Sequence, residues 1–82
     1  SDAVVLSAVK KSDQGEGLVI RLYNPTGQAA SATLRFDRPI REAWRLNLNE
    51  ERQSAIRKYE RTALPLRLGA KKIETVEVVL EG

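Results

Sequence analysis

The sequence contains no histidine, no cysteine and no methionine. Without histidine the chain lacks the commonest general base and the commonest metal ligand, and without cysteine it lacks thiolate nucleophiles and disulfides. A Ser-His-Asp triad and a His-ligated zinc site are therefore excluded from this chain. Because complete natural proteins seldom lack all three residue types, we interpret the chain as an excised piece of a longer protein.

Long apolar runs are also missing. No stretch approaches the ~20 apolar residues that a membrane-spanning helix requires, and no basic and then apolar signal peptide opens the chain. The single Asn-x-Thr triplet, Asn24-Pro25-Thr26, carries proline at the position that prevents N-glycosylation. These absences predict no membrane partner and favour a cytoplasmic, bacterial protein.

Neither the basic nor the acidic residues are concentrated in one part of the sequence. The 14 basic and 11 acidic residues alternate along the chain and leave a net charge of +3. A nucleic-acid interface would gather Lys and Arg on one face beside several aromatic side chains, whereas this chain has one Trp, two Tyr and one Phe. We therefore expect no nucleic-acid partner. The whole chain, residues 1–82, is short enough to form one domain with a small core.

Short β-branched or alternating runs separated by turn residues fill most of the chain. This spacing of about ten residues is typical of an antiparallel β-sandwich of the immunoglobulin-like kind. We predict six or seven strands, near residues 3–9, 17–23, 30–36, 40–48, 54–59, 64–68 and 73–80. The strand near 54–59 is the weakest of these, because residues 49–62 also carry three apolar side chains at helical spacing.

Two runs near the N-terminus resemble a known family. They are Val5-Leu6-Ser7-Ala8-Val9-Lys10-Lys11-Ser12 and, after a turn, the run from Gly17 through Arg21-Leu22-Tyr23-Asn24 to Gly27. Together they are similar to the first hairpin of the last β-domain of family 38 glycoside hydrolases, the α-mannosidases and their bacterial relatives. The runs Ala43–Glu51 and Lys72–Val78 are similar to later parts of that domain, although Lys72 stands where the family usually has Glu.

The resemblance implies an accessory role. In family 38 a separate N-terminal α/β domain holds a zinc ion and an aspartate nucleophile, and none of those residues can be placed on this chain. We therefore expect no catalytic, cofactor-binding or metal-binding residue here, with zinc in the catalytic domain of the parent enzyme. The expected partners are the other domains of that enzyme, which would hydrolyse α-mannosidic bonds. An autonomous carbohydrate-binding module and an immunoglobulin-like protein-interaction domain remain alternatives.

The outer face of the strand near 17–23 is the predicted contact surface. Alternation places Val19, Arg21 and Tyr23 together, opposite the core residues of the same strand, where they could contact a neighbouring domain or a sugar. Trp44 could also stack on a sugar, but its alternation with Leu46 and Leu48 predicts a core position. The adjacent Glu50 and Glu51 are too few ligands to predict a calcium site.

Overall fold

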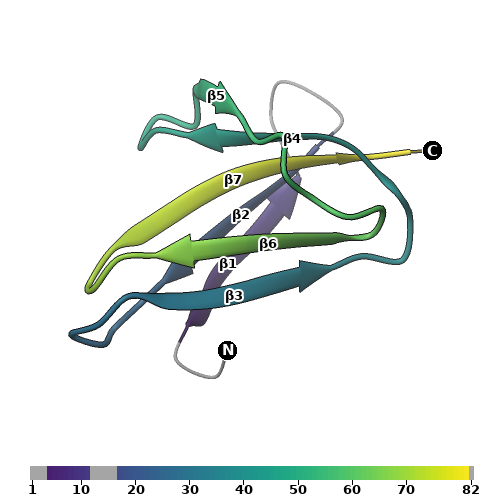
Figure 1. Ribbon diagram of the computed structural model, residues 1–82. Coiled ribbons are helices and arrows are strands. Elements are labelled where there is room, and N and C mark those ends of the chain that lie inside the picture. Colours follow the sequence, from purple (N-terminus) through teal and green to yellow (C-terminus); the bar gives the residue numbers. More distant parts are fainter. Residues whose placement is uncertain (1–3, 12–16, 82) are drawn as a thin grey trace.

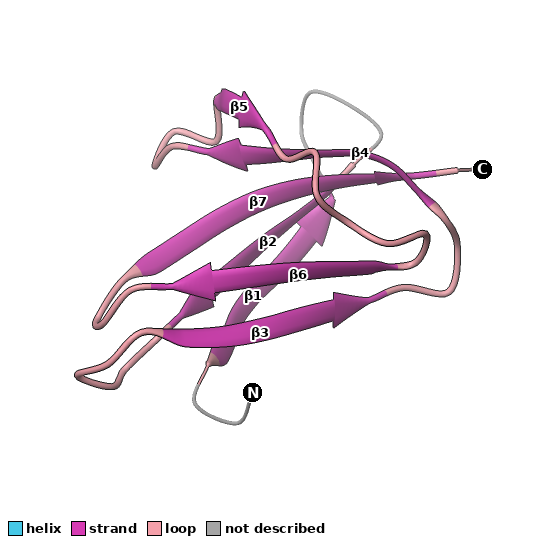
Figure 2. Ribbon diagram, in the orientation of Figure 1, coloured by secondary structure: helices cyan, strands magenta, loops and turns pink. Residues whose placement is uncertain are grey.

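A computed structural model describes residues 4–11 and 17–81 of the chain. The described residues form seven strands and no helix (Figure 2). The strands are β1 (Val5–Lys11), β2 (Leu18–Tyr23), β3 (Ala30–Arg35), β4 (Ile40–Leu46), β5 (Arg52–Ala55), β6 (Ala63–Leu68) and β7 (Ile73–Leu80). The predicted all-β fold is confirmed, and nothing in residues 4–11 or 17–81 is a helix that could cross a membrane.

Two antiparallel sheets of unequal size form the sandwich. The larger sheet has the strand order β1-β2-β7-β4-β5, and the smaller sheet pairs β3 with β6. Figure 1 shows β3 and β6 side by side as one layer against the larger sheet, with β1 at one flank of that sheet and the β4–β5 hairpin at the other. Because two strands cannot cover five, parts of the inner face of the larger sheet have no opposing strand.

The core forms between the two sheets from alternating apolar residues. Its buried members are Ile20, Leu22, Ile40, Ala43, Leu64, Leu66, Leu68, Val76 and Val78. The predicted inward face of β2 is confirmed by this set, and β6 and β7 supply the other alternating members. β6 pairs with β3 alone in the two-stranded sheet, so one of its edges is free to hold Pro65, which cannot donate a ladder hydrogen bond.

Asn24 fastens the connection between the two sheets. Its side chain is completely buried, and its amide nitrogen donates to the carbonyl oxygens of Gln28 (2.7 Å), Leu68 (3.2 Å) and Gly69 (3.0 Å). Its side-chain oxygen accepts from the backbone nitrogen (3.0 Å) and the hydroxyl (2.7 Å) of Thr26. One side chain thus ties the turn after β2 to the turn between β6 and β7.

A bulge in β4 places Trp44 on a different face of the sheet from the predicted one. The register with β7 shifts between Ile40 and Glu42, so that Ile40 and Ala43 both point into the core. Trp44 therefore lies on the outer face, and the prediction that it belongs to the core was wrong. Strict alternation assumes an unbroken ladder, and the bulge reverses the faces of every residue that follows it.

The end of β4 and the position of β5 also differ from the prediction. The side-chain oxygen of Asn47 accepts from the backbone nitrogens of Asn49 and Glu51, both at 2.9 Å, which turns the chain and leaves Leu48 83% exposed. The next strand is therefore residues 52–55 and not 54–59. After Ile56, whose nitrogen donates to the carbonyl of Ala43 at 2.8 Å, the chain leaves β4 as a loop.

Candidate functional site

The three predicted contact residues share the outer face of β2, as their alternation indicated. Val19 pairs with Lys10 and Glu77, Arg21 with Ala8 and Thr75, and Tyr23 with Val5 and Ile73. Val19 is only 5% exposed although it lies on the outer face, so little of its side chain can reach another domain or a sugar. Arg21 and Tyr23 are half-buried, and the Arg21 Nε donates to the Thr75 hydroxyl at 3.4 Å. Their role as an interdomain or sugar contact stays a prediction.

The turn between β4 and β5 helps to cover Val19. Glu50 lies in this turn with a positive φ of 62°, and its carboxylate pairs with Lys10 of β1 at 2.8 Å. The two side chains line a small surface hollow together with Ala8, Val19 and Arg21. Glu50, for which the sequence predicts no calcium site, therefore forms a salt bridge between the two flanks of the larger sheet.

A charged cluster occupies the outer face beside Val19. Glu77 of β7 is 4% exposed, and its carboxylate accepts from the Arg52 Nε at 2.8 Å. This hydrogen bond is the main reason why the pKa of Arg52 is raised above its ordinary value. The guanidinium carbon of Arg52 also lies 4.6 Å from the centroid of the Trp44 ring, within the range of a cation–π contact. Arg52 thus neutralises a buried carboxylate and covers one tryptophan face.

Glu77 leaves no room for a side chain at Gly17. A Cβ atom built on Gly17 would lie 2.6 Å from the Glu77 Cγ, closer than real contacts allow, and Glu77 cannot move away without losing Arg52. We expect Gly17→Ala to destabilise the domain by about 1–3 kcal/mol, as overpacking does. Gly27→Ala is the matched control, because nothing lies within 4 Å of a Cβ there and neither glycine has a positive φ. Urea denaturation of both variants checks this, and equal midpoints would contradict it.

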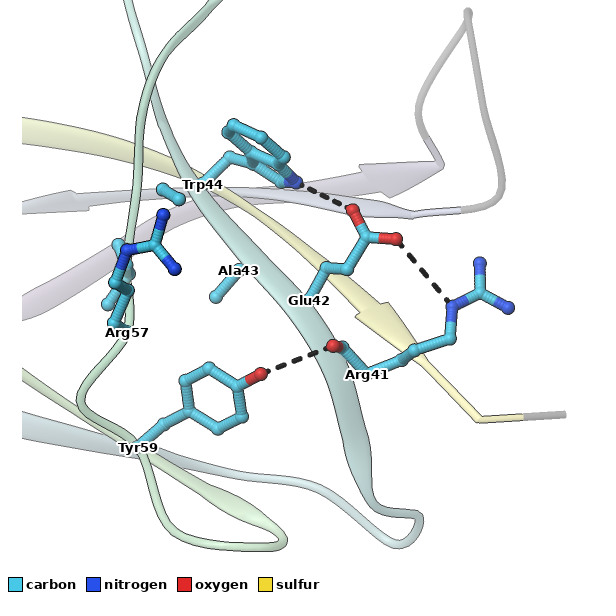
Figure 3. A pocket seen from close by; sticks show the side chains of 8 residues that line it. Arg41, Glu42, Ala43, Trp44, Arg57 and Tyr59 are labelled. Carbon is cyan, nitrogen blue, oxygen red and sulfur yellow. Dashed lines mark hydrogen bonds and ion pairs between the residues drawn. The ribbon is translucent and has the colours of Figure 1, made fainter.

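A pocket of about 400 Å³ opens where the chain leaves β4. In Figure 3 the rings of Trp44 and Tyr59 lie on opposite sides of Ala43, with Arg57 at one flank and Glu42 at the other. The remaining lining residues are Arg41, Ala55 and Ile56. The sequence pattern predicts a core position for Trp44 and gives no signal that connects this residue with Tyr59.

Five large apolar side chains are conspicuously exposed among the described residues. They are Val5, Leu6, Val9, Leu48 and Ile73, and three of the five lie on β1. Leu6 and Val9 pair with the core residues Leu22 and Ile20, yet they are 56% and 53% exposed because the smaller sheet does not cover this flank. We call Leu6 and Val9 the β1 patch.

The described part of the chain does not meet the requirements of a metal site. Within residues 4–11 and 17–81, no three His, Cys, Asp or Glu side chains gather in a way that could hold a metal ion. The sequence contains no histidine or cysteine at all. The residues of this chain therefore do not fit the zinc ion that the family resemblance implies for the parent enzyme.

Comparison with known families decides where the fold belongs. Residues 3–76 match the family described as the glycosyl hydrolases family 38 C-terminal beta sandwich domain. The chain belongs to this family. The family 38 C-terminal domain thus includes both the first hairpin, on which the sequence resemblance rested, and the pocket beside β4. No curated protein and no solved structure is significantly similar to this family 38 domain.

Proposed function

We propose that this chain is a non-catalytic accessory domain of an α-mannosidase-like enzyme and that it stabilises the enzyme by docking on its preceding domains. The observation that carries the proposal is the match of residues 3–76 to a C-terminal domain of glycosyl hydrolase family 38. In this proposal the parent hydrolyses α-mannosidic bonds in the cytoplasm of a bacterium, and its zinc ion belongs to the catalytic domain.

The composition of the chain supports a non-catalytic role. Retaining glycosidases need two carboxyl groups about 5–5.5 Å apart, one of them acting as nucleophile. Several carboxylates of the described residues form ion pairs with basic side chains, such as Glu77 with Arg52 at 2.8 Å and Glu50 with Lys10 at 2.8 Å. Carboxylates held in this way stabilise the fold and are poorly placed to attack a sugar.

The β1 patch supports the docking role. Leu6 and Val9 lie on an edge strand that pairs with β2 alone, and their side chains are 56% and 53% exposed although their partners Leu22 and Ile20 are core residues. The patch is also close to the chain entry, because β1 begins at Val5 and the family match begins at residue 3. In a C-terminal domain the rest of the enzyme precedes this point, so the preceding domains are the partner that we propose for the patch.

Activity measurements test the assignment. We expect the full-length parent to hydrolyse an aryl α-mannoside and the 82-residue chain to release no aryl alcohol above the uncatalysed rate. Aryl α-glucoside and aryl β-mannoside serve as control substrates for the parent. Turnover by the purified chain that disappears when one of its carboxylates is replaced would refute the non-catalytic role. A parent that cleaves the control substrates and leaves the α-mannoside intact would refute the proposed specificity.

A further inference from the structure

The pocket beside β4 is a consequence of two local irregularities. The bulge at Arg41 shifts the first part of β4, and the chain leaves β4 after Ile56, so that residues 57–59 swing away from the strand. The gap between them has a volume of about 400 Å³, which lies within the range of about 300–1,000 Å³ for ligand pockets. Bulges often occur beside binding sites because they redirect side chains.

Both aromatic rings of the pocket are held in place by the protein itself. The Trp44 Nε1 donates to the Glu42 carboxylate at 3.0 Å, and the Tyr59 hydroxyl donates to the carbonyl of Arg41 at 3.2 Å (Figure 3). Arg52 covers one face of Trp44 at 4.6 Å. The rings therefore need little reorganisation on binding, which reduces the entropy cost of capturing a weak ligand.

The polar groups at the pocket mouth can both donate and accept hydrogen bonds. The exposed guanidinium of Arg57 makes no hydrogen bond or ion pair with any residue in 4–11 or 17–81, so its donors face solvent. The Glu42 carboxylate, whose side chain is 42% exposed, retains acceptor capacity beside its bond to Trp44. The negative charge of Glu42 is compensated by the guanidinium groups of Arg41 (3.8 Å) and Arg52 (3.9 Å), and the two aromatic rings favour a ligand that combines hydroxyl groups with an apolar face.

We propose that this pocket binds a neutral pyranose, the terminal sugar of an oligosaccharide. A pyranose presents C–H groups on its faces, which pack against the electron-rich faces of aromatic rings, and hydroxyl groups around its rim. Trp44 and Tyr59 would contact the apolar surface, while Arg57 donates to hydroxyl oxygens and Glu42 accepts from hydroxyl groups. The further step that the sugar is an α-linked mannose rests on the proposed function of the parent.

Tryptophan fluorescence of the 82-residue chain is a direct probe, because Trp44 is its single tryptophan. We expect titration with α-mannobiose to give a saturable change with a dissociation constant on the order of 1 mM. Cellobiose and inorganic phosphate are the comparison ligands. The absence of any saturable change with either disaccharide, or tighter binding of phosphate than of sugar, would overturn the proposal. Equal binding of both disaccharides would support a pyranose site and count against mannose, and thus against the proposed parent.

Variants connect the signal to the pocket. We expect Tyr59→Ala and Arg57→Ala to weaken mannobiose binding at least about tenfold while the variants keep the circular dichroism of the original chain. Arg67→Ala is the matched control, since Arg67 is an exposed arginine of β6 in the smaller sheet. Tyr59→Phe retains the ring and is expected to bind more tightly than Tyr59→Ala. Unchanged affinity in both Tyr59→Ala and Arg57→Ala would place the sugar elsewhere and overturn the proposal.

Discussion

Replacing Asn24 by aspartate is expected to remove most of the stability of this domain. The substitution keeps the shape of a completely buried side chain and converts its amide nitrogen into an oxygen. That nitrogen donates to three backbone carbonyl oxygens, at 2.7, 3.0 and 3.2 Å, which belong to two different turns. The variant places a carboxylate oxygen against these three acceptors, so attraction becomes repulsion without any change in volume.

The expected cost is large compared with the stability of such a chain. A buried polar group left without its partner costs about 1–3 kcal/mol, and more when a charge is involved. At about 0.05–0.15 kcal/mol per residue, a domain of 82 residues has a total stability of roughly 4–12 kcal/mol. The loss of three hydrogen bonds together with a buried carboxylate facing three carbonyl oxygens is therefore expected to cancel most of this stability. Asn24→Ala removes the same three hydrogen bonds but adds no charge, and Gln28 and Gly69 keep the Thr26 hydroxyl (2.8 Å) and the Lys72 nitrogen (3.2 Å) as donors, so we expect a smaller loss.

Urea denaturation followed by circular dichroism measures this effect. Gln28→Ala is the control, because Gln28 joins the network through its backbone carbonyl and its own side chain is exposed. Thr26→Val removes the hydroxyl that donates to the Asn24 oxygen at 2.7 Å, and its urea midpoint is expected to lie between those of Asn24→Asp and Gln28→Ala. If Asn24→Asp unfolded at the same urea concentration as Gln28→Ala, the network would not hold the two turns together.

The regular part of the fold could be predicted from the sequence because alternation reports directly which side of a strand is buried. Leu18, Ile20 and Leu22 alternate without interruption, and the last two are core residues while Leu18 packs against them. The prediction for Trp44 was wrong because a bulge shifts the register of its strand between Ile40 and Glu42. Nothing in the residue pattern marks this shift, because the polar residues around it are equally acceptable on either face.

The role of Asn24 was visible in the sequence only as a turn. Pro25 explains why β2 ends at Tyr23, since proline removes a backbone donor, whereas Gly27 has no positive φ and the turn does not depend on its conformational freedom. The signal for the side chain was the Asn-x-Thr spacing, which allows the asparagine oxygen to accept from the backbone two residues later. The contacts with Leu68 and Gly69, at sequence separations of 44 and 45, depend on the tertiary fold and have no local signal.

Only part of the candidate contact surface on β2 could be predicted, again because some of its contacts depend on the tertiary fold. Alternation correctly placed Val19, Arg21 and Tyr23 on one face, but the burial of Val19 depends on the distant turn that brings Glu50 to Lys10. Charged substitution of Val19 would therefore disrupt this domain directly and would not report on docking. The β1 patch is the better test, because its two side chains are more than half exposed in the isolated chain.

Charged residues in the β1 patch are expected to destabilise the parent enzyme and to leave this domain intact. Full burial of an exposed leucine or valine side chain contributes about 1.5–3 kcal/mol, and since docking can bury only the exposed half of Leu6 and Val9, the loss of both contacts would cost about 1.5–3 kcal/mol at the docking interface. Placing unpaired lysines there adds a desolvation cost. We expect the double variant Leu6→Lys, Val9→Lys to lower the Tm of the full-length parent by several degrees.

The same substitutions should change little elsewhere. In the 82-residue chain both side chains are more than half exposed, so its Tm is expected to stay within about 2–4 °C of the original, as for ordinary surface substitutions in a domain of this size. The kcat of the folded parent is also expected to be nearly unchanged, because docking does not touch the reacting atoms. Leu48→Lys is the control for an exposed leucine away from β1, since Leu48 is 83% exposed in the β4–β5 turn.

Comparing the parent with the isolated chain distinguishes docking from a core role of the patch and from a substrate contact. If the Tm of the isolated chain fell as far as that of the parent, the patch would be a part of the domain's own core. If the parent kept its Tm and instead showed a raised KM, the patch would contact substrate. A lower Tm confined to the parent, with kcat and KM retained, is the result that docking requires, because only an interface formed outside this domain can be lost without affecting either the domain or the chemistry.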